Sequence, residues 1–203
     1  MSEIIPLNVL NYNTTHVGKK TMKTNHIRYK GIALATVVIL LIPWVAMQFT
    51  DEVVWDLGDF IIMGFLLFGT GLMYEFISKQ VGSARYRIAV GVGLLGMFLL
   101  VWVNGAVGII GSENNNANMM YMGVPIVGII GGIMVRFRVQ EMARVMFITA
   151  LAQALVPIIA LIIWQPMSWG AAGMLGVFIL NAFFVSLFLG SAWLFRYAAR
   201  DFS

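Results

Sequence analysis

Six long apolar runs dominate this chain of 203 residues. A helix needs ~20 apolar residues to cross a hydrocarbon core of ~30 Å, and backbone groups in lipid must form hydrogen bonds within their own segment. The runs are continuous, whereas the strands of a membrane β-barrel alternate in polarity. The sequence therefore predicts an all-α polytopic transmembrane helix bundle of six spans, at about 32–50, 59–77, 86–110, 119–135, 145–164 and 171–195.

Composition supports the same class of protein. The chain is 60% hydrophobic and 11% charged, whereas soluble domains carry roughly 25% charged residues. It contains no cysteine, which excludes disulfides, thiolate metal sites and a cysteine nucleophile. We therefore expect the lipid bilayer as its first partner and no nucleic acid.

The basic residues indicate an orientation. All thirteen Lys and Arg residues lie before the first run, between runs two and three, between runs four and five, or after the sixth. The opposite connections carry acidic residues, namely Asp51, Glu52, Asp56, Asp59 and Glu113. The positive-inside rule then places both termini in the cytoplasm. We expect a polar, basic cytoplasmic tail at 1–31 and a six-helix transmembrane domain at 32–199.

The connection at 112–118 is rich in Ser and Asn, which are ordinary turn residues. We expect a solvated turn at the outer membrane surface. Asn104 lies about two turns below it, and Pro125 frees the carbonyl of Tyr121, so Asn104 is a candidate donor to that carbonyl. The adjacent thioethers of Met119, Met120 and Met122 are possible Cu(I) ligands, although Met is more often an apolar filler.

Small residues recur within the spans and predict close helix contacts. Association in lipid depends on close backbone approach, and residues four apart share one helix face. Packing within the bundle is the favoured interpretation, and a homo-oligomer interface is the alternative. The candidate packing residues are Gly105, Gly108, Gly128, Gly131, Ala182, Ser186 and Gly190.

Four polar residues form a candidate polar seam: Asn104, Gln153, Asn181 and Glu75. Gln153 and Asn181 lie equally far from the short connection between spans five and six, so the rise of a helix places them at one depth. We expect their amides to be in contact. Glu75 precedes Lys79 by four residues, which favours an ion pair, with a proton-accepting carboxylate as the alternative.

The outer acidic residues also allow a cation site. Carboxylate oxygens suit Ca²⁺ or Mg²⁺, and such a site would use Asp56, Asp59 and Glu113. The competing interpretation is that they are solvated carboxylates, with Asp59 favoured at a helix N-terminus by the helix dipole.

The sequence shows no other residue pattern typical of a catalytic, cofactor or metal site. His16 and His26 are the only histidines, and both precede the first span. No nucleophile–base pair and no P-loop spacing is visible. We therefore expect no enzyme activity, no cofactor and no metal within the bundle.

Residues after position 50 resemble a group of small, uncharacterised multi-pass bacterial inner-membrane proteins. The likeness is carried by WDLGDFIIMGFLLFGTGLMYE at 55–75, WVNGAVGIIGSENNNANMMY at 102–121, MARVMFITALAQALVPIIAL at 142–161 and LNAFFVSLFLGSAWLFRYAAR at 180–200. The resemblance implies a location in the bacterial inner (cytoplasmic) membrane and implies no activity.

Two functions from different classes remain open. The first is a small transporter or channel-like protein that passes a small solute or cation along the polar seam. The second is a non-catalytic accessory or scaffold subunit that packs in a homo-oligomer or a larger membrane complex. The direction of the Ala182, Ser186 and Gly190 face distinguishes them, because a face turned to lipid implies a partner.

Overall fold

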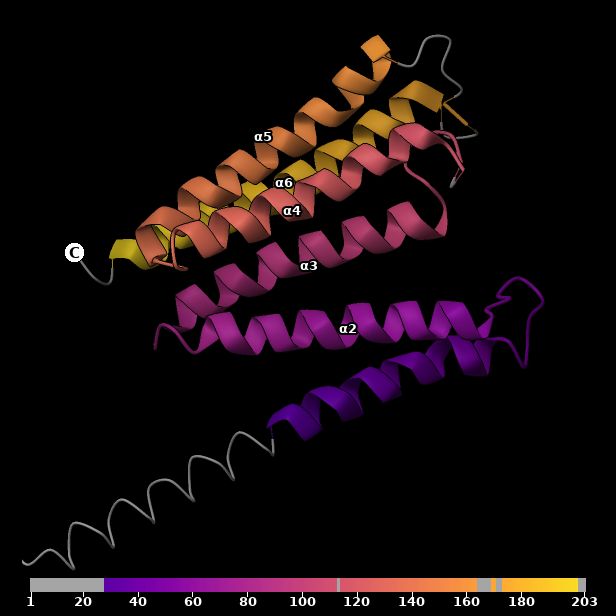
Figure 1. Cartoon of the computed structure of the whole chain (residues 1–203), viewed down its shortest axis with the longest axis horizontal. Helices are drawn as coiled ribbons and strands as arrows, with labels where there is room; N and C mark the ends of the chain where they lie inside the picture. Colours follow the sequence, from indigo (N-terminus) through magenta and orange to yellow (C-terminus); the bar gives the residue numbers. More distant parts are fainter. Residues whose placement is uncertain (1–27, 113, 164–168, 171–172, 201–203) are drawn as a thin grey trace, which may run out of the picture. The chain divides into compact units, whose positions relative to one another are not determined.

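The computed structural model describes residues 28–112, 114–163, 169–170 and 173–200. These residues form helices and connecting turns, without a strand among them (Figure 1). Six of the helices are long and apolar enough to cross a membrane. The predicted fold class is therefore confirmed, and the chain is a multi-pass membrane protein.

The helices differ from the predicted spans mainly at their ends. α3 ends at Ala106 and not at 110, because Gly108 adopts a left-handed φ of +69°. α5 begins at Val139 and not at 145, so its first turns carry charged residues. The first helix already includes residues 28–31, which were expected in the tail, and residues 1–27 lie outside the described part. The helices are Arg28–Ala46, α2 (Leu57–Ser78), α3 (Ala84–Ala106), α4 (Met119–Met134), α5 (Val139–Ile163) and α6 (Gly173–Ala199), with a short 3₁₀ helix η1 (Asn116–Asn118) before α4.

The chain divides into two compact units, Met1–Leu72 and Met73–Ser203, with the division inside α2. The described part of unit 1 contains the first helix and most of α2. A Cβ added at Gly71 would lie 2.6 Å from Ile32 Cγ2, and one at Gly64 would lie 3.4 Å from Leu40 Cδ1. Glycine therefore permits the close approach of the two helices at Gly71, whereas a side chain at Gly64 would make ordinary van der Waals contact.

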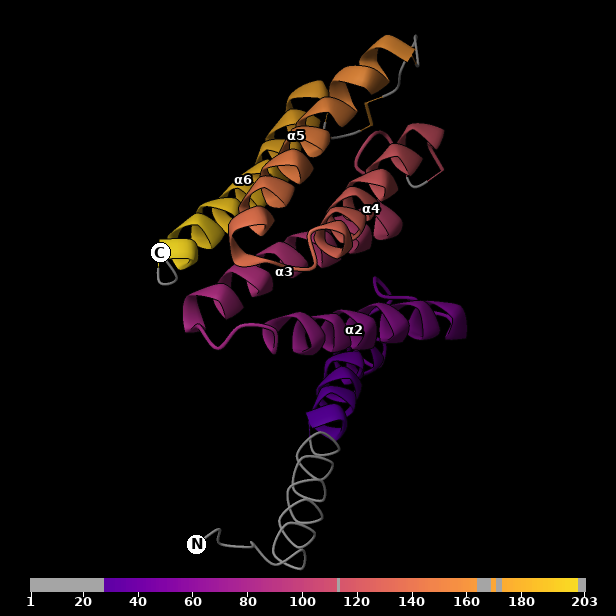
Figure 2. The ribbon, with the colours of Figure 1, turned by 60° about the vertical axis from the view of Figure 1, so that its left-hand side comes forward.

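Unit 2 contains the last residues of α2 and helices α3 to α6. α5 packs most extensively against α6, α3 also packs on α6, and α4 packs on α5. Figures 1 and 2 show α5 and α6 running side by side in both views. Between α3 and α6, Ser191 Oγ donates to the Ala89 carbonyl at 2.8 Å, and Gly93 leaves the room that this hydroxyl occupies. A side-chain bond to a carbonyl lets a polar residue lie in an apolar interface without an unsatisfied donor.

One end of unit 2 carries Arg85 and Arg87 at the start of α3 and Arg196 in the last turn of α6, and we call it the basic end. Tyr86, fully buried, packs its ring edge-on against Phe195 with centroids 5.4 Å apart. Its hydroxyl donates to the Phe137 carbonyl at 2.8 Å. Arg136 and Phe137 both have positive φ in the tight turn between α4 and α5, so this hydrogen bond helps to hold a strained turn.

The opposite end of unit 2, formed by residues 107–118, is the asparagine end. Between the two ends the outer surface is apolar. Ile158, Ile162, Leu175 and Ile179 are among the exposed large side chains of α5 and α6. A helix that is apolar all round belongs in a large core or in lipid, and these exposed faces fit the second environment.

Candidate functional site

The amides of Gln153 and Asn181 meet between α5 and α6. Gln153 Nε2 donates to Asn181 Oδ1 at 2.8 Å, and both side chains are buried. The predicted contact is therefore confirmed. Within the part of the chain that the structure describes, Gln153 Oε1 has no hydrogen-bond partner, so the pair joins the helices but leaves one acceptor without a described donor.

A single buried side chain, Asn118, organises the turn at the asparagine end. Its Oδ1 accepts from the N–H groups of Ile109 at 3.0 Å and Ile110 at 2.8 Å. Its Nδ2 donates to the carbonyls of Ile110 at 3.1 Å and Ser112 at 2.6 Å. The amide therefore uses both donors and both acceptor positions. The expectation of a simply solvated turn is wrong at this residue, although Asn114 and Asn116 are exposed.

Asn104 also serves this turn, but through a different carbonyl from the one predicted. Its Nδ2 donates to the carbonyl of Asn118 at 3.0 Å, and not to that of Tyr121. The physical reason is the early end of α3, which places Asn104 in the last turn of that helix and not two turns below the surface. Asn104 Oδ1 and Tyr121 Oη are buried, and no described residue forms a hydrogen bond with either atom.

Gly108 was predicted as a helix-packing residue, and the structure corrects this. It lies in the turn after α3, and its added Cβ would meet the Ser112 backbone at 2.5 Å and Asn118 Nδ2 at 2.6 Å. A residue with a side chain would meet both a left-handed backbone and a steric clash. Gly108 is therefore required by the fold around Asn118.

The remaining small residues separate into two groups. A Cβ added at Gly128 would meet Met97 and Thr149, and one added at Gly131 would lie 2.9 Å from Val145 Cγ1. Both glycines therefore lie at helix contacts, as predicted. Gly105 and Gly190 have nothing within 4 Å of an added Cβ. Ala182 and Ser186 are exposed. Within the described part of unit 2, Gly105, Ala182, Ser186 and Gly190 therefore lie on open faces. They do not pack inside that unit, and the alternative of an interface stays a hypothesis for them.

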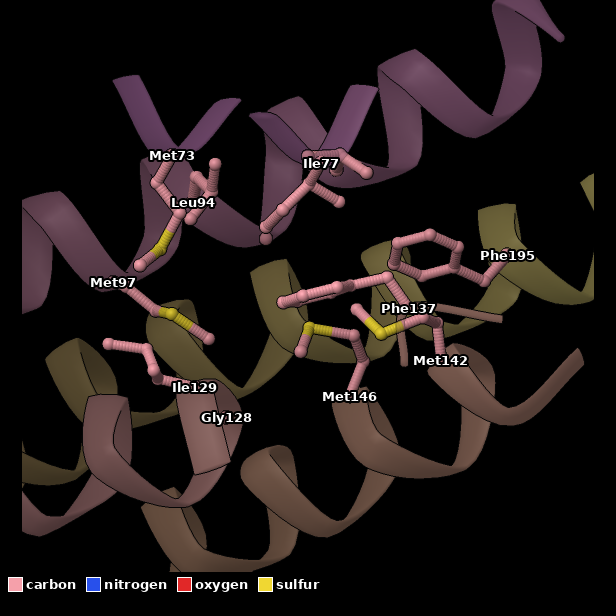
Figure 3. Close-up of a pocket in the computed structure, with 12 residues that line it drawn as sticks. Met73, Ile77, Leu94, Met97, Gly128, Ile129, Phe137, Met142, Met146 and Phe195 are labelled. Carbon is pink, nitrogen blue, oxygen red and sulfur yellow. The ribbon is translucent and has the colours of Figure 1, made fainter. Parts of the chain in front are cut away.

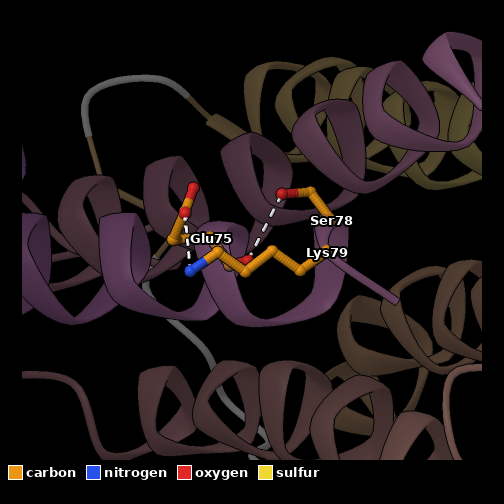
Figure 4. A network of polar contacts seen from close by, with 3 residues as sticks. All are labelled: Glu75, Ser78 and Lys79. Carbon is orange, nitrogen blue, oxygen red and sulfur yellow. Dashed lines mark hydrogen bonds and ion pairs between the residues drawn. The ribbon is translucent and has the colours of Figure 1, made fainter. Parts of the chain in front are cut away.

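Glu75 forms the predicted ion pair. Its Oε1 lies 2.9 Å from Lys79 Nζ, and the Ser78 hydroxyl donates to the Glu75 carbonyl at 3.4 Å (Figure 4). The Glu75 side chain is 12% exposed and that of Lys79 is 36% exposed. A carboxylate held by a neighbouring ammonium satisfies the charge locally, which is the arrangement that i,i+4 spacing favours.

Asp56 and Asp59 in unit 1 act as reciprocal caps of α2. Asp56 N–H donates to Asp59 Oδ2 and Asp59 N–H donates to Asp56 Oδ1, both at 2.9 Å. This geometry is a capping box with Asp in both positions. Glu113 lies outside the described residues, and within the described part no group of three or more His, Cys, Asp or Glu side chains could hold a metal ion. The alternative of an outer cation site therefore gains no support from the described residues, and capping of α2 fits the favoured interpretation of Asp59.

The methionines do not form the cluster that the Cu(I) hypothesis requires. Met119 is 74% exposed, so Met119, Met120 and Met122 do not share one buried face. Four other methionines line a cavity of about 30 Å³ in unit 2: Met73, Met97, Met142 and Met146 (Figure 3). Its remaining lining is apolar, with Phe137 and Phe195 among the contributors. A small apolar cavity of this kind stays dry, and flexible methionines are common around such gaps.

Comparison with known proteins finds no similar protein. No family model matches the chain, and neither a curated protein nor a solved structure does. Function therefore has to be argued from the geometry of these residues alone.

Proposed function

We propose that the protein is a non-catalytic integral membrane subunit that assembles through the open face of α6. In the simplest case the partner is a second copy of the chain. The observation that carries the proposal is the outward position of the small-residue stripe, which consists of Ala182, Ser186 and Gly190. Residues at four-residue spacing lie on one face, and small residues let another helix approach closely in lipid.

The chemistry of the stripe fits a helix contact. Ser186 Oγ already donates to the Phe183 carbonyl at 2.7 Å, so its hydrogen does not need a partner in an apolar interface. Exposed Ile179 and Phe183 stand next to the stripe. Large side chains beside a small-residue groove provide the ridges and grooves that packed helices need.

The polar seam supports this function better than it supports transport. The Gln153–Asn181 pair bonds α5 to α6, Asn104 bonds the turn at the asparagine end, and Glu75 bonds Lys79. Each of these side chains therefore has a structural partner, and Gln153 is 0% exposed.

A transporter or channel-like protein remains the second candidate. One observation favours it: three buried oxygens, Asn104 Oδ1, Tyr121 Oη and Gln153 Oε1, have no hydrogen-bond partner among the described residues. Unsatisfied buried groups are costly, and a passing solute or water would satisfy them. Solute uptake into liposomes that contain the purified protein tests this candidate, with Gln153→Leu as the variant expected to abolish uptake.

The location that we propose is the bacterial inner membrane, with both termini in the cytoplasm. The segregation of the thirteen basic residues supports the orientation. The location is an expectation that rests only on the likeness of four stretches after residue 50 to small bacterial inner-membrane proteins.

Cysteine crosslinking tests the assembly. The chain has no native cysteine, so Ser186→Cys introduces a single thiol on the open face. Oxidation in membranes is expected to give a product of twice the chain mass. The matched control is Gly123→Cys, which is exposed on α4 with nothing within 4 Å and is expected to stay monomeric.

A second pair of variants tests the same helix contact without a crosslinking reaction. Gly190→Leu fills the stripe and Gly123→Leu fills an equally open position. The first is expected to shift the protein toward smaller particles in detergent, and the second is not. Equal behaviour of both variants, together with no crosslinked product specific to the Ser186→Cys variant, would exclude α6 as the contact.

A further inference from the structure

A groove runs along α5 and α6 at the basic end of unit 2. It has a volume of about 790 Å³ and adjoins a second hollow of about 340 Å³, because Trp193 and Arg196 line both. Sites for small molecules have volumes of roughly 300–1,000 Å³. The side chains that matter for the groove are Arg144, Phe147, Ile148, Leu189, Trp193 and Arg196.

The charge of the groove is positive. Arg144 and Arg196 line it, and Arg200 lines the adjoining hollow. Among the described residues that line the two, none is acidic. Glu141 lies 3.1 Å from Arg144 in an ion pair that is largely exposed, and an exposed pair contributes little. Arg144 and Arg196 against the single Glu141 leave a local excess of positive charge that favours an anion.

Aromatic side chains mark the depth of the groove in the bilayer. The rings of Trp193 and Tyr197 are stacked, with centroids 5.8 Å apart and an interplanar angle of 4°. The guanidinium of Arg85 lies 4.7 Å from the Tyr197 ring centroid. Trp and Tyr are enriched at the headgroup level of membranes, which is also the level of lipid phosphates, so this aromatic pair suits a phosphate contact to the arginines.

The groove becomes apolar away from the basic end. Phe147 and Ile148 follow Arg144 along α5, and Leu189 precedes Trp193 on α6, and all three apolar side chains are exposed. One helical turn advances ~5.4 Å, so the step from guanidinium to exposed hydrocarbon takes about one turn. This order of charge, aromatic ring and hydrocarbon is that of a phospholipid read from headgroup to acyl chain.

We propose that this groove is a binding site for an anionic phospholipid, with the phosphate between Arg144 and Arg196 and an acyl chain along Phe147, Ile148 and Leu189. Basic pockets between transmembrane helices bind such headgroups in general. A free phosphate would use the arginines and leave the apolar part unused, so the lipid satisfies more of the lining. Leu189 and Trp193 lie three residues from Ser186 and Gly190 on α6, so the groove borders the stripe. The lipid proposal does not need the proposed assembly, because the variants that test it leave Ala182, Ser186 and Gly190 unchanged.

Fluorescence quenching by brominated lipids tests the site in the intact protein. The purified full chain is reconstituted with brominated phosphatidylglycerol or brominated phosphatidylcholine of the same chain length. Quenching by the anionic lipid is expected at a lower mole fraction. Trp193→Phe is expected to remove this difference, whereas Trp102→Phe, near the asparagine end, is expected to keep it.

Charge variants then test whether Arg144 and Arg196 bind the lipid headgroup. Each basic residue near the surface is worth about fivefold in binding, so Arg144→Gln with Arg196→Gln is expected to reduce the preference for phosphatidylglycerol roughly 25-fold. The matched control is Arg87→Gln with Arg138→Gln, which removes the same charge from exposed positions that do not line the groove. The control pair is expected to keep most of the preference.

Three results would overturn the proposal. The first is equal quenching by both brominated lipids in the wild type. The second is an equal loss in the two double variants, which would indicate diffuse surface charge. The third is displacement of phosphatidylglycerol by millimolar inorganic phosphate at constant ionic strength, which would make the arginines a simple anion site.

Discussion

Replacing Asn118 by Ala tests how strongly one buried amide holds the turn after α3. The substitution removes both acceptor contacts to the N–H groups of Ile109 and Ile110, which are buried. A buried donor left without a partner costs ~1–3 kcal/mol, so two of them predict a loss of about 2–6 kcal/mol in the free energy of unfolding. The carbonyl of Ile110 also loses the Asn118 donor, whereas that of Ser112 keeps the Asn115 N–H at 3.0 Å. The loss at Ile110 places the expected value above the lower limit.

Reversible unfolding in mixed micelles, followed by far-ultraviolet circular dichroism during a titration with sodium dodecyl sulfate, measures this loss. Hydrogen exchange at Ile109 and Ile110 adds a local readout, because their amides are expected to exchange faster in the variant than in the wild type, while the amides within α3 are expected to stay unchanged. The matched control is Asn116→Ala. Asn116 is an exposed residue of the same turn, and exposed substitutions usually stay within about 0.5 kcal/mol.

The reasoning would be refuted by an Asn118→Ala variant that unfolds within about 1 kcal/mol of the wild type and shows unchanged exchange at both amides. That result would mean that water replaces the amide without cost. An equal loss in Asn116→Ala would mean that the whole turn, and not the buried side chain, is responsible.

Three further predictions concern the helices and their ends. Gly108→Ala is expected to lower the free energy of unfolding by about 1–3 kcal/mol, because Gly108 has a left-handed φ. The control Gly105→Ala lies in open space and is expected to leave the free energy of unfolding unchanged or slightly higher. Equal effects of the two variants would contradict the assigned turn. A double-mutant cycle with Gln153→Leu and Asn181→Leu is expected to give a coupling of ~0.6–2 kcal/mol, and additive losses would show that the 2.8 Å contact contributes nothing. A single cysteine at position 115 is expected to react with an impermeant maleimide from outside intact cells, and one at position 138 only after permeabilisation; the reverse pattern would invert the proposed orientation.

The number and type of elements could be read from the sequence because the bilayer constrains them. A segment in lipid has to satisfy its own backbone and span a fixed thickness, so six apolar runs predict six helices. The same geometry placed Gln153 and Asn181 at one depth, and i,i+4 spacing paired Glu75 with Lys79. These are consequences of rise and period along one or two helices, which need no knowledge of the surrounding packing.

The faces of the helices could not be predicted in this way. In a soluble protein a polar face marks the outside, but here both the interior and the lipid are apolar, so the pattern does not show which side turns inward. Gly128 is packed against Met97 and Gly190 faces open space, although both occur among similar apolar residues. The packing of the helices makes this distinction, and the order of residues does not.

The asparagine run shows the same limit at a turn. Asn116 is exposed and Asn118 is buried with four side-chain hydrogen bonds, two residues apart in one run of similar composition. What separates them is the end of α3 at Ala106 and the left-handed Gly108, which bring the backbone of 109–112 around one amide. Six membrane-crossing helices follow from the residues alone, because lipid dictates helix length and backbone pairing. Which side chains lie inside depends on packing between apolar surfaces that look alike in the sequence.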